Sequence, residues 1–463
     1  MNPFARKALV VLSSVALAAC SSLTPENLFS HYSIQNQSVR SDVAQGKYAS
    51  AQSALEGRSD FSMLGQFELG RVALLNSDIA LSQDALQRAD QEVRVWQDKP
   101  TISISDTLAS TGALVVNDNM AEYSPRDYEL GFLHLYLGLN YIYNNDLEGA
   151  LVEVRRANQV QEAAKQKRER SLASAENDLA SQGIQPNLGS VLARYPNAGK
   201  KLQAVQNGYL FYLSALLYET EGELNSAFVD YRRALAVMPD NQTIIDGAQR
   251  VARRLGMRQD LELLEKEYGS SPTLEPSHAR VILIEERGVV EAMKGWRLDL
   301  PIWDSRNKGA IYSVALPYYT GQARTSWPPV MINGYSSSAD LLVDVDAMAQ
   351  QALSEEIVSI IARQAVRVWV KDRLRKEASG KDDLGNALFN IWNTVTEQPD
   401  TRTWQSLPQY VVSSELNVEA GEQRVQVDGE QYNFSVQEGR TVLVWVSRHS
   451  QQPVIWHKQL GNL

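Results

Sequence analysis

Apolar residues recur every three or four positions through most of residues 36–268, which predicts amphipathic helices packed on one another. The clearest pair of helices lies at residues 208–239, where Gly222 turns the chain and Pro239 ends the second helix. Small residues allow the two helices to approach closely, and tyrosines fill the space between them. The positions that carry this pattern are Gly208, Ala215, Tyr218, Gly222, Ala227, Tyr231, Ala234 and Pro239.

The same pattern returns elsewhere in the first half of the chain. A second copy fits residues 131–162, with Asn145 at its turn. A weaker copy starts near Met63, two repeat lengths of about 34 residues before the second one, and a half-repeat at residues 46–55 precedes it. This pattern resembles the tetratricopeptide repeat (TPR), and the resemblance implies a TPR-like α-solenoid over residues 36–268.

Two segments interrupt the repeats, namely a polar insert at residues 101–123 and an overlong helix that continues past Asn158. In tetratricopeptide domains the first helix of each repeat lines a concave groove that faces the ligand, so the resemblance implies a partner-binding groove. The groove is apolar and aromatic, and an exposed patch of this kind marks an interaction site. Alternatively, the insert or the C-terminal domain packs into it. The groove positions are Phe132, Leu135, Tyr136, Leu139, Tyr209, Tyr212, Leu213 and Leu216.

The pattern changes at residues 269–279, a linker with two prolines, and then becomes rich in β-branched and alternating residues. We therefore predict an α+β chain, in which a smaller mixed α/β domain at residues 280–463 follows the solenoid and ends in an antiparallel β-sheet or sandwich. The predicted strands include residues 281–284, 311–316, 411–412, 425–427, 432–436, 442–446 and 454–456, and the predicted helices are 354–371, with Ser354 as N-cap, and 384–395.

The first nineteen residues have the layout of a secretory signal. Arg6 and Lys7 precede an apolar run over residues 8–17, and small residues follow it. The run is too short to span a bilayer as a helix. Residues 1–19 are therefore predicted to be a signal peptide.

The segment Leu17-Ala18-Ala19-Cys20 resembles the lipobox of bacterial lipoproteins, which implies cleavage before Cys20 and lipidation of its thiol, with palmitate among the acyl chains. The alternative is an ordinary secretory signal with an incidental cysteine. Ser21 follows where an aspartate would resemble an inner-membrane retention signal, so the resemblance implies the outer membrane, with the body on its periplasmic face. Residues 20–35, the lipidated cysteine and a short tether, keep the body close to the membrane.

Composition narrows the classes of function. The chain carries a formal charge of −10, and of −12 once Arg6 and Lys7 leave with the signal, which argues against nucleic acid as a partner. Cys20 is the only cysteine, so the mature chain can form no internal disulfide and no thiolate metal cluster. No later apolar run approaches 20 residues, so no further membrane-spanning helix is expected.

Strong catalytic and nucleotide-binding motifs are absent from the sequence. Asp344 and Asp346 lack the glycine and the distal glutamate of a calcium-binding loop. We therefore predict no catalytic residue, no metal site and no cofactor. Arg363, Arg367 and Lys371 form a basic stripe at helical spacing, which is interpreted as a solvated or paired face, or alternatively as a contact for an anionic polymer or lipid headgroup.

The segment Asp400-Thr401-Arg402-Thr403-Trp404 lies where helices give way to strands, and its acid, base and indole predict a structural corner between the layers. Together with residues 123–129 and 362–367, it resembles a poorly characterised family of repeat-containing bacterial lipoproteins. The resemblance spans most of the mature chain. It implies an outer-membrane location and no established reaction.

From these patterns we expect a membrane-anchored periplasmic scaffold or adaptor that binds a periplasmic or outer-membrane protein through the TPR-like groove. A narrower form of this hypothesis is regulation of cell-wall synthesis. The alternative is an enzyme that modifies envelope polymers in the C-terminal domain, which needs convergent acids or a nucleophile in a cleft.

Overall fold

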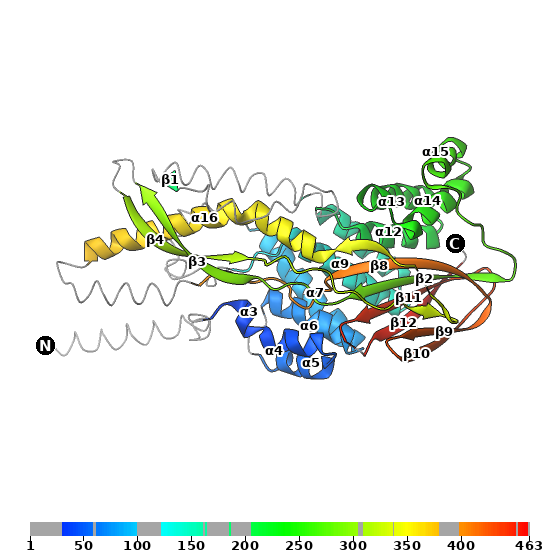
Figure 1. Ribbon diagram of the computed structural model, residues 1–463, viewed down its shortest axis with the longest axis horizontal. Helices are drawn as coiled ribbons and strands as arrows, with labels where there is room; N and C mark the ends of the chain where they lie inside the picture. Colours follow the sequence, from blue (N-terminus) through cyan, green and yellow to red (C-terminus); the bar gives the residue numbers. More distant parts are fainter. Residues whose placement is uncertain are drawn as a thin grey trace.

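The computed structural model describes residues 30–58, 62–99, 122–160, 163, 185–186, 205–303, 309–336, 338–378, 398–450 and 452–461. The predicted signal peptide, Cys20, the tether up to residue 29, most of the insert at 101–123 and the predicted helix at 384–395 lie outside the described residues. Within them, helices occupy the first half, and three sheets with one long helix occupy the second (Figure 1). The predicted α+β fold class is confirmed.

The first half is a series of helical hairpins, each made of two helices joined by a short turn. A short helix, α3 (Tyr32–Gln35), precedes them. The hairpins pair α4 (Gln37–Ala44) with α5 (Tyr48–Glu56), α6 (Met63–Leu75) with α7 (Ile79–Gln97), α9 (Asp127–Tyr143) with helical residues 147–160, α12 (Gly208–Thr220) with α13 (Leu224–Val237), and α14 (Gln242–Leu255) with α15 (Arg258–Tyr268).

The same turn ends the first helix of all five described hairpins. One residue there has a left-handed backbone, with φ between 61° and 79°. The amide of the next residue donates to the carbonyl five positions earlier, at 2.8–3.0 Å, which is the hydrogen bond of a Schellman motif. This recurrence supports the predicted repeats and adds a fifth hairpin, α14–α15. The left-handed residues are Gly46, Ser77, Asn145, Gly222 and Gly256.

The C-terminal half contains a central sheet of five strands in the order β12-β11-β2-β8-β7. Its neighbours are antiparallel except β11 and β2, which run parallel. A four-stranded antiparallel sheet has the order β10-β9-β5-β6, and β1 joins the end of the long β3–β4 hairpin. The strands are β1 (Gln185–Pro186), β2 (His278–Arg287), β3 (Lys294–Trp303), β4 (Gly309–Tyr318), β5 (Met331–Ile332), β6 (Tyr335–Ser336), β7 (Asp340–Asp344), β8 (Tyr410–Glu419), β9 (Gly421–Val427), β10 (Glu430–Val436), β11 (Thr441–Arg448) and β12 (Val454–Gly461).

Both faces of the central sheet are buried. Alternate residues of a strand point to opposite faces. In β2, Val281 and Leu283 belong to an apolar core shared with the four-stranded sheet, whereas Ile282 and Ile284 belong to a core shared with the helices. This double burial explains why β2 is a continuous apolar run in the sequence. The core on the helical side is continuous from α4 to β12, so repeats and sheet form one body.

The long helix α16 (Val345–Ala378) begins earlier than predicted. Ser354 is not its N-cap, because its hydroxyl donates to the Gln350 carbonyl at 2.9 Å within the helix. Instead, the Asp344 carboxylate accepts the Ala347 amide at 2.9 Å. With 34 residues the helix is about 51 Å long. Figure 1 shows α16 running beside β3 and β4, away from the hairpins of α12 to α15.

The connection between the halves runs from the end of α15 at Tyr268 to the start of β2 at His278. Strand β3 had no counterpart in the prediction, since Pro301 and the charged residues around it weaken a strand pattern. Its pairing partner β4 contains the predicted run at 311–316. Among the described helices, none combines the length and the apolar character needed to cross a membrane.

Candidate functional site

The residues predicted to line the partner groove lie on α9 and α12, and all eight are 0% exposed. They belong to the core shared with the central sheet. The expectation of an open groove at these positions is therefore corrected, and the alternative, in which the C-terminal domain packs into this face, describes the structure. The physical reason is that burial stabilises an apolar face by about 25 cal/mol per Å². The residues are Phe132, Leu135, Tyr136, Leu139, Tyr209, Tyr212, Leu213 and Leu216.

Trp404 and Trp445 are the largest side chains of this core, and both are 0% exposed. The Trp404 ring stacks on Phe67 of α6, with centroids 4.8 Å apart and planes at 25°, and it meets Tyr136 edge-on at 5.7 Å. The indole Nε1 donates to Ser406 Oγ at 3.1 Å, which satisfies the buried N–H. The predicted structural corner at residues 400–404 is thus confirmed, because this segment joins helices to sheet.

Two buried glutamates hold the backbone of the same segment. Glu129 of α9 accepts the Trp404 amide at 2.7 Å, and Glu68 of α6 accepts the amides of Gln405 at 2.7 Å and Ser406 at 3.0 Å. Both side chains are 0% exposed, and burial raises the pKa of each above the usual glutamate value. The repeats therefore bind a stretch of their own chain through its backbone amides.

An ion pair crosses the interface between the helices and the central sheet. Arg71 Nη2 of α6 lies 2.5 Å from Glu286 Oε2 of β2, and both side chains are fully buried. The guanidinium also lies 4.6 Å from the centroid of the Tyr136 ring. Burial opposes the charge of Arg71, but the Glu286 carboxylate raises the Arg71 pKa above its ordinary value. Removing either partner would leave an unpaired buried charge, so the pair ties α6 to β2.

A recess of about 280 Å³ lies where α14 meets the central sheet. We call it the arginine recess. Asp246 of α14, Glu415 of β8 and residues 272–274 of the connection complete its lining. The volume is at the lower end of the range for small-ligand sites. Four arginines line it, namely Arg250, Arg253 and Arg254 of α14 and Arg280 of β2.

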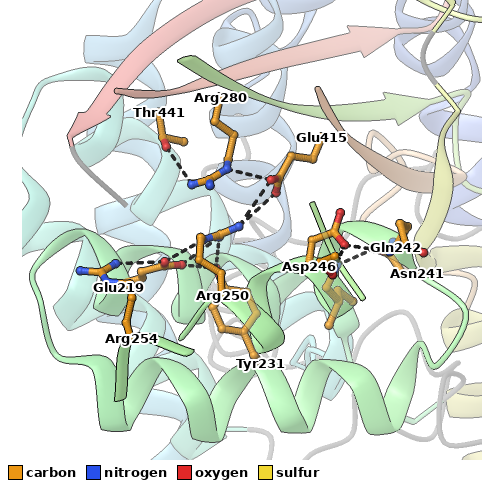
Figure 2. Close-up of polar contacts among 12 residues, drawn as sticks. Glu219, Tyr231, Asn241, Gln242, Asp246, Arg250, Arg254, Arg280, Glu415 and Thr441 are labelled. Atoms are coloured by element: carbon orange, nitrogen blue, oxygen red, sulfur yellow. Dashed lines mark hydrogen bonds and ion pairs between the residues drawn. The ribbon is translucent and has the colours of Figure 1, made fainter. Parts of the chain in front are cut away.

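Arg250 and Arg280 are the two buried arginines of the arginine recess, and we call them its floor. Figure 2 shows their contacts with Glu219 and Glu415. Arg250 Nε and Nη2 donate to the two oxygens of Glu219 at 2.8 and 2.9 Å, and Arg280 Nε lies 2.7 Å from Glu415. The side chains of Arg250 and Arg280 are 10% and 6% exposed. Burial opposes the charge of Arg250, but Glu219 and Glu415 hold its pKa well above the usual arginine value. Burial and the neighbouring charge of Arg250 lower the pKa of Arg280.

Arg253 and Arg254 form the open rim of the recess. Arg253 Nη2 lies 3.3 Å from Glu265 of α15, and Arg254 Nη1 lies 3.2 Å from Glu219. Their side chains are 35% and 36% exposed. The arginines of the rim are therefore more hydrated than those of the floor, so their ion pairs contribute less stability.

The predicted basic stripe is not a solvated face along its length. Arg363 is exposed, whereas Arg367 is 2% exposed and makes an interaction within the chain, which fits the paired form of the prediction. The side chain of Lys371 lies outside the described residues. Asp346, considered above for calcium, is 5% exposed and accepts the Glu291 amide at 2.7 Å. Burial raises the pKa of Asp346 to about 6.

Sequence reasoning missed Glu68, Glu129 and the arginine recess. One signal was available, because an aromatic-Glu-Leu-Gly tetrapeptide occurs at residues 67–70 and again at 128–131. A glutamate inside an otherwise apolar helix implies a buried partner. On α14, Asp246, Arg250 and residues 253–254 share one helical face, but nothing local shows that this face meets β2 and β8.

Within the described part of the chain, no group of three or more His, Cys, Asp or Glu side chains is placed to hold a metal ion. No family model and no curated protein matches the sequence. A solved structure titled MamA AMB-1 is 13% identical, with a TM-score of 0.29 over 51% of this chain and 91% of its own. A second, titled MamA MSR-1, is 12% identical, with a TM-score of 0.27 over 50% of this chain and 91% of its own. The helical repeats are recognised from the five left-handed turns of the chain itself.

Proposed function

We propose that the chain is a lipid-anchored adaptor of the bacterial cell envelope, and that it binds a protein partner at the arginine recess instead of the groove of its repeats. The observation that carries the proposal is the recess itself, which gathers four arginines from two elements at the junction of helices and sheet. The groove is filled by the chain's own Trp404 segment and sheet, so the repeats serve as a rigid support for this surface.

The anchor is the second part of the proposal. Lipid on Cys20 would hold the body at the periplasmic face of the outer membrane, because two or more acyl chains give lasting attachment. Cells labelled with radioactive palmitate should yield a labelled chain, and Cys20→Ser should remove the label. Ser21→Asp should move the protein to inner-membrane fractions. A wild-type chain without label would contradict the lipoprotein assignment.

In-cell photo-crosslinking tests the adaptor role on the full, membrane-bound protein. A benzoylphenylalanine replaces Thr273 at the rim of the recess or, as a control, Val95, which is 62% exposed on α7. We expect one discrete protein adduct at position 273, none at position 95, and loss of the adduct with Arg253→Gln/Arg254→Gln. Equal adducts at both positions, or no adduct at the rim, would count against a partner at this surface.

A narrower form of the proposal is that the partner is a periplasmic enzyme of cell-wall synthesis. A deletion strain should then show altered wall composition and altered sensitivity to wall-directed antibiotics. Unchanged values for both would remove this form and leave the adaptor proposal intact.

A further inference from the structure

The arginine recess has a rigid floor and an exchangeable rim. At the floor, Arg250 donates to Glu219 at 2.8 and 2.9 Å, and Arg280 lies 2.7 Å from Glu415, whereas Arg250 lies 3.4 Å from Glu415. These side chains are at most 10% exposed. The rim contacts of Arg253 and Arg254 are 3.2–3.3 Å, and these side chains are about one-third exposed. A ligand anion can therefore replace water and part of an ion pair of Arg253 or Arg254, while the two hydrogen bonds from Arg250 to Glu219 remain.

Donor capacity exceeds what the recess uses. A guanidinium has five N–H donors in a planar fork that matches the two oxygens of a carboxylate. Arg253 and Arg254 each make one ion pair, through a single nitrogen, to Glu265 and Glu219 respectively. Arg253 and Arg254 both line the recess, so each can offer N–H donors to one incoming oxyanion.

The charges around the recess are closely balanced. Four carboxylates accompany the four guanidinium groups, two in the lining and two that pair with the arginines, namely Asp246, Glu415, Glu219 and Glu265. One added negative charge therefore disturbs this balance less than the two charges of a dianion such as phosphate.

The remaining lining is apolar. Pro272 and Leu274 of the connection also line the recess, and the volume of about 280 Å³ accommodates little more than one residue. The recess therefore offers a carboxylate site next to a small apolar wall. A peptide that ends in a free α-carboxylate and an apolar side chain combines both features.

From this arrangement we infer that the arginine recess binds the free C-terminal carboxylate of a partner protein, with Arg253 and Arg254 as the ligands of the carboxylate and Pro272 and Leu274 as the wall for the terminal side chain. The inference rests on the proposed adaptor function and specifies its partner by chemistry. The specificity of such a site comes from the charged end of the chain and from the size of its last residue.

Fluorescence anisotropy with the full chain in detergent tests this inference. The probes are four labelled pentapeptides, Gly-Ser-Gly-Ser-X, in which X is Ala, Val, Leu or Phe, each as the free acid and as the C-terminal amide. We expect at least one acid to bind about tenfold or more tightly than its amide, because a hydrogen bond to a charged group contributes at least that factor. Inorganic phosphate at the same concentration should compete poorly.

Two rim variants and one matched control complete the test. Arg253→Gln and Arg254→Gln should each weaken binding of the acid about tenfold, and both keep Arg250 on Glu219 and Arg280 on Glu415. Arg232→Gln removes a similar exposed ion pair, 3.4 Å long, to Asp260 on the same hairpins and should leave binding unchanged. Circular dichroism checks that all three variants are folded.

Several results would overturn the inference. These are no binding of any acid at millimolar concentration, equal binding of acid and amide, equal loss in the control variant, or stronger competition by phosphate than by unlabelled acid. If these occur while the crosslink at position 273 persists, the adaptor proposal stands and only the carboxylate chemistry fails. Loss of the crosslink alone would contradict the adaptor proposal.

Discussion

Replacement of Arg71 by methionine gives the sharpest prediction about the interface between repeats and sheet. The change removes a guanidinium that lies 2.5 Å from Glu286 and leaves the Glu286 carboxylate 0% exposed. The remaining donors to Glu286 are weak, namely Trp445 Nε1 at 3.3 Å and the Tyr136 hydroxyl at 3.5 Å. Loss of one partner of a buried ion pair costs about 3–5 kcal/mol of the free energy of unfolding.

The double variant Arg71→Met/Glu286→Leu should recover much of this loss. Replacing both partners by apolar residues removes the unpaired charge, and such replacements are often neutral or stabilising. We therefore expect the double variant to be at least about 2 kcal/mol more stable than Arg71→Met. The matched control is Arg88→Met, which breaks an ion pair with Asp84 whose side chains are 56% and 50% exposed. It should cost less than about 1 kcal/mol.

The loss of stability caused by Arg71→Met should also depend on pH. Burial raises the pKa of Glu286, and the Arg71 charge opposes that increase. Without Arg71 the folded-state pKa rises further above the unfolded value, so the folded state is favoured when Glu286 is protonated. The loss caused by Arg71→Met should therefore be smaller at pH 5 than at pH 8.

Urea unfolding of the unlipidated Cys20→Ser chain, followed by tryptophan fluorescence and far-UV circular dichroism, measures these differences. A cost below about 1 kcal/mol for Arg71→Met would refute the reasoning, because it would mean that the buried charge finds another partner or solvent. The same conclusion would follow if the double variant were no more stable than the single one.

Three further changes test other contacts. Trp404→Ala should lower the free energy of unfolding by about 3–5 kcal/mol, measured in urea, and Trp404→Phe should lower it clearly less. A loss below about 1 kcal/mol for Trp404→Ala would contradict the buried stacking. Burial raises the Asp346 pKa to about 6, so the stability that protonated Asp346 contributes is present at low pH and is lost as pH rises through 6. Asp346→Asn should therefore reduce the fall in the thermal unfolding midpoint between pH 5 and pH 7.5. An unchanged fall would contradict this. Gly247→Ala should lose about 1–3 kcal/mol, since its Cβ would meet the Tyr231 ring at 2.3 Å; equal stability would show that the ring can move away.

The helical hairpins could be predicted because their signals are local. Ala215 and Ala227 are both 0% exposed, in keeping with two helices that approach closely, and Gly222 has φ 79° at the turn between them. One repeat length contains all the residues of the pattern, namely the small residues, the turn residue and the terminal proline. The whole pattern can therefore be recognised in one stretch of sequence. Most strands were also found, since alternating residues and turn glycines are local signals.

The occupant of the groove could not be predicted from such signals. Glu68 and Glu129 meet the backbone of residues 404–406, and Glu68 and Gln405 are 337 positions apart in sequence. The parallel pairing of β2 with β11 likewise joins distant segments, and it sets Trp445 beside Ile284, both of which belong to the core on the helical side. Apolar groove residues look the same in sequence whether another protein or the chain's own sheet covers them.

Hydrogen exchange at the backbone amides of Trp404, Gln405 and Ser406 tests most directly whether the repeats bind their own chain. These amides donate to buried carboxylates of Glu129 and Glu68, so they should exchange only when the whole body unfolds. A free energy of unfolding of about 5 kcal/mol or more would slow their exchange by more than about a thousandfold. We expect the same protection for them as for the amides at the centre of α12. Exchange within seconds, as expected for the exposed residue Thr273, would contradict a closed groove.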